Sequence, residues 1–182
     1  EAVALIYYTN SDSMIADLQY DWVYHEHLFY FSLIALEKLL ERHGLQVYDL
    51  KRIGTHAGSI RYYACRRGMT EETPAVQDQR DKEYWHGLAV KERFTNFAQA
   101  AADHRDAMRQ FVDTAKTRGQ KVAGYGACGR SNTMIQFCGF TADDIDFIVD
   151  DAPAKQGFYT PGSHIPIRSN HYLLSQPDKL IV

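Results

Sequence analysis

The chain has 182 residues, a formal net charge of −3, and 45% hydrophobic and 24% charged residues, which is the composition of an ordinary globular protein. Charges of both signs are mixed along it, so no basic stripe indicates a nucleic-acid partner. Cys65, Cys128 and Cys138 lack metal-ligand spacing, and their odd number argues against a secreted disulfide framework. We find no signal peptide and no apolar run of the ~18–20 residues that cross a bilayer. The composition therefore predicts a cytoplasmic protein without a metal site or a membrane partner.

Strand-like and helix-like patterns alternate in the first part of the chain, as in an α/β fold. Ser32 is the expected N-cap of a helix whose leucines recur at helical spacing, and Gly44 is expected to end that helix. In chain order, the predicted elements are a buried strand over 3–8, a short helix over 11–18, a strand over 20–23, a helix over 33–43, and a hairpin of strands over 46–53 and 59–66.

The second part predicts a long helix and a second α/β module. An amphipathic pattern begins at Phe94 and ends at Gly119, and on it we expect His104 and Arg105 to lie on a solvated face. The module that follows is predicted to contain a strand over 121–123, a helix over 131–138, a strand over 145–149 and a strand that begins at residue 179.

Titratable and aromatic side chains are concentrated between Tyr24 and Ser32. His25, Glu26 and His27 are consecutive there, and Tyr30 adds a second phenol. The predicted strand before them would place the cluster at a carboxyl end of a sheet, where ligands bind in open α/β folds. The alternative is a packed aromatic corner, but burying such polar groups without partners costs roughly 1–3 kcal/mol each. The cluster is therefore the leading candidate for the chemistry.

A glycine-rich loop follows the predicted strand over 121–123. Gly124, Gly126 and Gly129 have the G-x-G-x-x-G spacing, and Asp150 lies some twenty residues further on. This pattern is typical of a dinucleotide site, and backbone amides at such a helix start can hold a phosphate. The alternative is that the glycines only permit a tight turn and close strand-to-helix packing.

Several separated segments, in order along most of the chain, resemble one known family. They are Tyr24-His25-Glu26-His27, Tyr30-Phe31-Ser32, Gly44-Leu45, and the residues at 56–61, 124–127, 149–157 and 159–167. This order of segments resembles S-adenosylmethionine-dependent sugar C-methyltransferases, which act on nucleotide-linked 4-keto-deoxysugars. The resemblance implies C-methylation through a base-generated enolate, with S-adenosylmethionine as cofactor and a nucleotide sugar as the substrate partner.

The resemblance also implies the domain organisation. Residues 1–66 would be the C-terminal portion of a class I methyltransferase domain, with a Rossmann-like sheet that ends in an antiparallel hairpin. Residues 67–118 would be a helical connection, and residues 119–182 a second Rossmann-like domain that is truncated. The family's donor-binding loop and zinc-binding cysteines have no counterpart here, so we expect an inactive fragment that does not bind S-adenosylmethionine by itself.

The resemblance implies roles for particular residues. His27 would be the catalytic base, and Glu26 and Tyr24 would orient it or donate to the developing oxyanion. Ala57 stands where relatives usually carry a second glycine. The expected substrate-binding residues are Tyr30, His56, Arg61, Lys155, Tyr159 and His164.

Two functions of other classes stay open. One is a non-catalytic nucleotide or nucleotide-sugar binding module built on residues 119–182. The other is an NAD-dependent oxidoreductase domain, which rests on Gly124, Gly126 and Gly129 alone, and which the mixed charges of Asp150, Asp151 and Lys155 disfavour.

Overall fold

A computed structural model of the chain describes residues 4–9, 11–54, 58–176 and 179–181. The chain folds into two compact mixed α/β units. Unit 1 comprises residues 1–19 and 27–99, and unit 2 comprises residues 20–26 and 100–182. None of the helices in the described ranges is long and apolar enough to cross a membrane.

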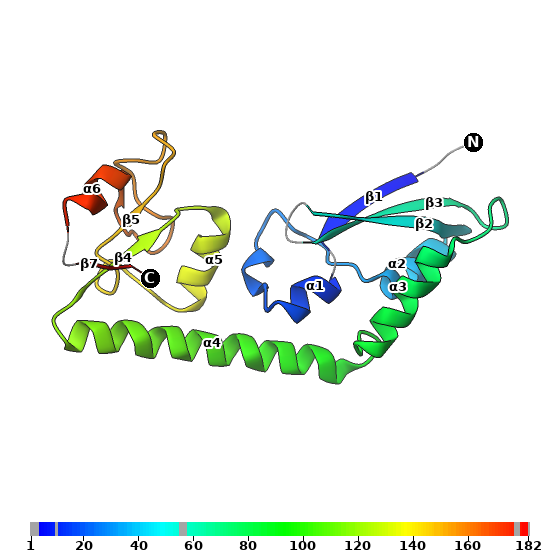
Figure 1. Cartoon of the computed structure of the whole chain (residues 1–182), viewed down its shortest axis with the longest axis horizontal. Helices are drawn as coiled ribbons and strands as arrows, with labels where there is room; N and C mark the ends of the chain where they lie inside the picture. Colours follow the sequence, from blue (N-terminus) through cyan, green and yellow to red (C-terminus); the bar gives the residue numbers. More distant parts are fainter. Residues whose placement is uncertain (1–3, 10, 55–57, 177–178, 182) are drawn as a thin grey trace. The chain divides into compact units, whose positions relative to one another are not determined.

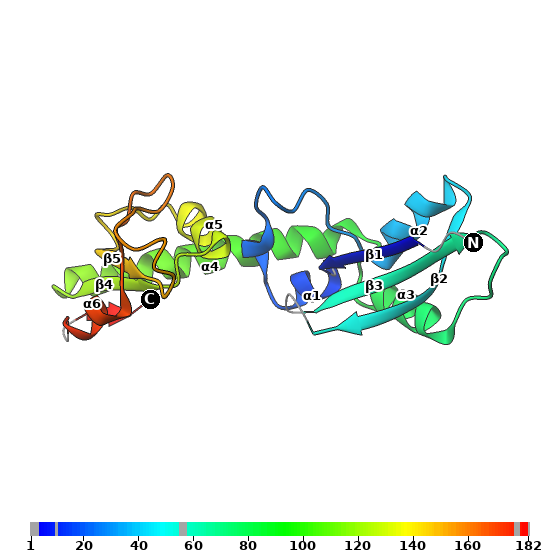
Figure 2. The ribbon, with the colours of Figure 1, turned by 90° about the horizontal axis from the view of Figure 1, so that it is seen from above.

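Unit 1 contains a three-stranded antiparallel sheet of β1 (Ala4–Thr9), β2 (Leu45–Ile53) and β3 (Ser59–Arg66). The order is β1-β3-β2, so the last strand in the sequence lies between the other two (Figure 2). Ile53 pairs with Ser59 at the closed end of the β2–β3 hairpin, which confirms the predicted hairpin. β1 is antiparallel to β3 and lies at the edge of this sheet.

Helices cover one face of this sheet. They are α2 (Leu33–Glu41) and α3 (Pro74–Trp85), which lie beneath the strands in Figure 1, while α1 (Ser11–Ala16) follows β1. Apolar side chains of α2, α3 and the two hairpin strands form the core between the layers. This core consists of Leu33, Leu36, Leu40, Val47, Ile60, Tyr62, Ala64 and Val76. Because its members recur at helical spacing on α2 and at alternate positions on β3, the core follows from local patterning.

The ends of α2 agree with the prediction. Ser32 Oγ accepts a hydrogen bond from Ala35 N at 3.1 Å, as an N-cap does. Gly44 has a φ of 68°, the left-handed conformation that commonly follows the last helical turn.

Unit 2 contains a four-stranded parallel sheet in the order β6-β5-β4-β7. Its strands are β4 (Lys121–Tyr125), β5 (Phe147–Val149), β6 (Ile167–Arg168) and β7 (Lys179–Ile181). The C-terminal half of α4 (Lys91–Thr117) and α5 (Gly129–Phe137) contribute to one core, and Leu173 of α6 (Asn170–Leu174) packs on a second cluster. The boundary between the two units falls within α4.

The strand predicted over 20–23 is wrong. Tyr20–Trp22 is a short 3₁₀ helix, η1, which packs on α5 in unit 2. The Tyr20 ring lies 5.2 Å from that of Phe137, and the Arg130 guanidinium lies 4.3 Å above the Trp22 ring. Aromatic residues favour strands, but these contacts, made more than 100 positions along the chain, outweigh that preference. The cluster after Tyr24 therefore follows a helical turn and not the end of a strand.

The prediction that His104 lies on a solvated face of α4 is also wrong. His104 is partly buried, and its Nδ1 lies 2.9 Å from the Tyr20 hydroxyl. Arg105 lies over the Phe137 ring at 5.5 Å. By contrast, Phe94 and Phe111 are 45% and 46% exposed, although the amphipathic pattern predicts them on the apolar face of the helix.

Candidate functional site

The cluster that is continuous in the sequence is divided between the two units. Tyr24, His25 and Glu26 belong to unit 2, and His27 begins the second segment of unit 1. The Tyr24 hydroxyl donates a hydrogen bond to Glu26 Oε2 at 3.3 Å. Partial burial of Tyr24, followed by the charge and hydrogen bond of Glu26, raises the pKa of the phenol above its usual 10. The phenol therefore stays protonated at neutral pH and acts as a donor.

In unit 1, His27 and Tyr30 lie in the irregular segment before α2. Their rings stack with centroids 6.3 Å apart and planes inclined by 25°. Leu28 and Phe29 between them are 77% and 58% exposed. The structure therefore brings His27 and Tyr30 together at the surface of unit 1, with two apolar side chains directed to solvent between them.

In unit 2, η1 holds Tyr24 at the glycine loop. Asp21 Oδ2 pairs with Arg130 Nη2 at 2.6 Å and accepts a hydrogen bond from its Nε at 2.7 Å. A β-carbon placed on Gly129 would lie 3.4 Å from the Tyr24 ring, an ordinary van der Waals distance, so the ring packs directly against the start of α5. No local sequence pattern predicts this docking, because Asp21 and Arg130 are 109 positions apart.

A pocket of about 210 Å³ opens beside Tyr24 in unit 2. Its wall combines the start of α5 with the loop before β6, and its polar groups are hydroxyls, an amide, an imidazole and a thiol. It is lined by Tyr24, His25, Ala127, Cys128, Gly129, Ser131, Asn132, Thr133, Thr160, Pro161 and Ile167. Most of these residues were not candidates from the sequence.

Cys128 is the N-cap of α5 and is exposed. Partial burial raises its pKa, but hydrogen bonds from Ser131 and from the backbone of Arg130, together with the charge of Lys155, outweigh burial and lower the pKa below its usual 9. The pocket wall therefore includes an exposed thiol whose pKa lies below its usual value.

Asp150 makes its hydrogen bonds within the loop region. Its Oδ2 accepts from Ala127 N at 2.8 Å and from Lys155 Nζ at 2.9 Å, and its Oδ1 accepts from Ala152 N at 2.9 Å. Partial burial raises its pKa, but the bonds to Lys155 and to the two backbone amides lower it overall. The acidic residue of the dinucleotide pattern thus ties the glycine loop to the segment after β5.

Gly124 and Gly126 of the loop each have a steric reason to be glycine. Gly126 has a φ of 93°, and a β-carbon on Gly124 would lie 3.0 Å from Ile148 of the neighbouring strand. Gly129 adjoins Tyr24, as described above.

The other predicted substrate residues are dispersed. Arg61 lies in the middle of β3, and its buried Nε has no hydrogen-bond partner among the described residues. The Tyr159 side chain is 61% exposed, and the backbone of Tyr159 forms an isolated antiparallel β-bridge with Pro166. His164 is exposed and has a left-handed φ of 54°. His56 lies outside the described residues.

Comparison with known proteins identifies the class to which these two units belong. The sequence profile of the family described as "C-methyltransferase C-terminal domain" matches residues 54–182. Since the match covers well over half of the chain, the chain belongs to this family of C-methyltransferases.

A particular relative is C-methyltransferase NovU of Streptomyces niveus. It is 36% identical over 157 residues, which make up 86% of this chain and 37% of the relative. The chain spans little more than a third of the relative's length.

Proposed function

We propose that this chain is part of an enzyme that transfers a methyl group from S-adenosylmethionine to a carbon of a nucleotide-linked keto-deoxysugar. Membership of the C-methyltransferase family supports methyl transfer to carbon. The strand order β1-β3-β2, with β3 antiparallel to both neighbours, is the order expected at the end of a class I methyltransferase sheet. The parallel order β6-β5-β4-β7, with a glycine turn after β4, is Rossmann-like.

The observation that carries the mechanism is the Tyr24–Glu26 hydrogen bond directly before His27 in the chain. His27 removes the proton from the carbon beside the ketone, since histidine is the side chain that most often acts as a general base. The electron pair moves to the keto oxygen, and the protonated phenol of Tyr24 donates to the enolate oxygen that forms. Glu26 orients Tyr24 and His27.

Methyl transfer then follows from the enolate. The nucleophilic carbon forms a bond to the methyl carbon of the sulfonium donor, the sulfur–methyl bond breaks, and S-adenosylhomocysteine leaves. We assign no residue of this chain to the donor. Contacts to the sugar or nucleotide are proposed for Tyr30, His56, Arg61, Lys155, Tyr159 and His164.

The test uses the full-length enzyme and deuterated water. His27→Asn should abolish methyl transfer and also stop exchange of the proton beside the ketone in the absence of donor, with a loss of roughly 10²–10⁴ in rate. Glu26→Gln should lower both rates less. If His27→Asn exchanges the proton at the native rate and Tyr24→Phe does not exchange it, the phenol is the base. If both variants exchange it at the native rate, the cluster is only a packed aromatic corner.

A second candidate function is nucleotide-sugar binding by unit 2 alone. The pocket beside Tyr24 and Cys128, with donors at the start of α5, favours it. Titration calorimetry of the chain with a nucleoside diphosphate, compared with the Thr160→Val variant, tests it. Saturable binding that the variant weakens supports this candidate, and heats at the level of dilution exclude it.

A further inference from the structure

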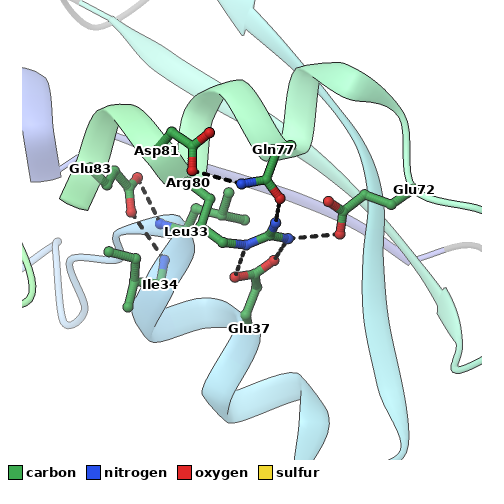
Figure 3. A network of polar contacts seen from close by, with 8 residues as sticks. All are labelled: Leu33, Ile34, Glu37, Glu72, Gln77, Arg80, Asp81 and Glu83. Carbon is green, nitrogen blue, oxygen red and sulfur yellow. Dashed lines mark hydrogen bonds and ion pairs between the residues drawn. The ribbon is translucent and has the colours of Figure 1, made fainter. Parts of the chain in front are cut away.

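The start of α2 is held by a fully buried carboxylate of another helix. Glu83 of α3 is 0% exposed, and its Oε1 and Oε2 accept hydrogen bonds from Leu33 N at 2.8 Å and Ile34 N at 3.0 Å (Figure 3). Ser32 Oγ takes the next amide, Ala35 N. The first three amides of α2 thus all have side-chain acceptors, two of them on one carboxylate.

Burial of the Glu83 carboxylate costs free energy, because the charged group loses its hydration. The positive end of the α2 dipole and its two amides offset that cost, and Gln79 Nε2 donates to Glu83 Oε1 at 2.9 Å. Gln79 is itself held by Arg52 Nη2 at 2.7 Å. Ser32 already caps the helix, so the carboxylate adds a fixed position for α2 relative to α3.

A second contact between the same helices lies one turn along each. Arg80 of α3 binds Glu37 of α2 as a fork, with Nε 3.0 Å from one carboxylate oxygen and Nη2 2.6 Å from the other (Figure 3). The Arg80 Nη2 also pairs with Glu72 at 2.7 Å. Two directional contacts, at Leu33 and at Glu37, fix both the rotation of α2 about its axis and its displacement along it.

The proposed base lies directly upstream of this fixed point. His27 is six positions before Leu33, and on the way the Phe31 carbonyl accepts a hydrogen bond from Ser11 N at 3.3 Å. His27, Leu33 and Glu83 all belong to unit 1. A displacement of the start of α2 is therefore transmitted through a short tethered segment to the imidazole.

We propose that Glu83 is a positioning residue that sets the location of His27 by fixing the start of α2. This inference rests on the proposed role of His27 as the base. Gln presents one oxygen and one NH₂ where the carboxylate presents two oxygens, so Glu83→Gln leaves one of the two amides without an acceptor.

The experiment compares Glu83→Gln with Val76→Ala in the full-length enzyme. Val76 is a fully buried core residue of the same helix that makes no side-chain hydrogen bond, so its variant reports destabilisation without loss of the cap. At temperatures where both variants are folded, Glu83→Gln should lower kcat and the deuterium exchange rate by roughly 10- to 100-fold, as expected for misplacement of about 1 Å. The KM for the sugar should change by less than about threefold. Val76→Ala should change neither.

An equal fall of kcat in both variants, or an unchanged kcat in Glu83→Gln, overturns the proposal. If Glu83→Gln does not fold, Arg80→Lys takes its place, since lysine keeps the charge and loses the fork, and a several-fold fall in kcat at unchanged KM is expected. His27→Asn is measured alongside. A native rate of deuterium exchange in His27→Asn refutes the proposed base. If His27→Asn loses exchange while Glu83→Gln and Arg80→Lys keep a normal kcat, only the positioning role of Glu83 is refuted.

Discussion

The Asp12 carboxylate, whose side chain is 2% exposed, lies 2.5 Å from Nδ1 of His86. Lys82 Nζ approaches the other oxygen at 3.1 Å. Asp12 belongs to α1, and both partners come from α3 or the residue directly after it. This ion cluster therefore joins the first helix of unit 1 to the third.

The Asp12 cluster predicts acid sensitivity of unit 1. Burial raises the pKa of Asp12, but hydrogen bonds from His86 and Lys82 and their charges lower it below the ordinary value of 3.8. A lowered pKa means that the stabilisation is present above the unfolded value and is lost as pH falls through the folded value. Asp12→Asn should lower the free energy of unfolding by about 2 kcal/mol at pH 7, and the difference from wild type should shrink below about pH 4.

Urea unfolding at pH 3–7 measures this effect, with the exposed Asp17→Asn as a control that should change little. A constant difference between wild type and Asp12→Asn at every pH would show that the carboxylate charge is irrelevant to stability.

Cys128 should be the most reactive of the three thiols. Its pKa is lowered at the start of α5, whereas Cys65 and Cys138 are buried and burial raises the pKa of Cys138. At pH 7 we expect iodoacetamide to alkylate Cys128 at least about tenfold faster than the others, as followed by peptide mass spectrometry. Ser131→Ala removes a hydrogen bond to the thiolate and should slow this reaction, while Thr133→Ala on the same helix should not. Equal alkylation of all three cysteines would contradict the prediction.

Unit 2 should not bind NADH in the manner of a dinucleotide domain, because both carboxylate oxygens of Asp150 are already engaged by Ala127, Ala152 and Lys155. We expect no saturable NADH fluorescence enhancement at low micromolar concentration. Asp150→Ala should instead lower stability by roughly 1 kcal/mol, since two partly buried amides lose their acceptor. Asp151→Ala serves as the matched control. Saturable enhancement that Asp150→Ala abolishes would restore the oxidoreductase alternative.

The docking of η1 on α5 can be followed through Trp22. Trp22 is 6% exposed beneath Arg130, whereas Trp85 is 88% exposed, so Trp85→Phe isolates the buried indole. In that background, Arg130→Met removes both the Asp21 ion pair and the cation–π contact and should shift emission to the red and increase acrylamide quenching severalfold. Arg105→Met, a matched change at a residue whose guanidinium lies over the Phe137 ring, should leave emission unchanged. Identical spectra for the two variants would show that η1 stays docked without Arg130.

Elements whose signals are local could be predicted from the sequence alone. Ser32 and Gly44 bound α2 because a side-chain cap and a left-handed residue are decided by neighbours in the chain. The β2–β3 hairpin follows from two strand-like runs and the short link between them.

The division of the titratable cluster between the two units depends on long-range packing and could not be predicted from the sequence. Tyr24 and Glu26 go to unit 2 and His27 to unit 1, because Arg130 holds Asp21 and Trp22 on α5 through contacts more than 100 positions away. Such contacts leave no periodic trace in the sequence, and they overrode the strand preference of residues 20–23. In the sequence Glu83 ends a charged run that begins at Asp78, and its burial at the start of α2 exists only because the two helices pack on the same sheet.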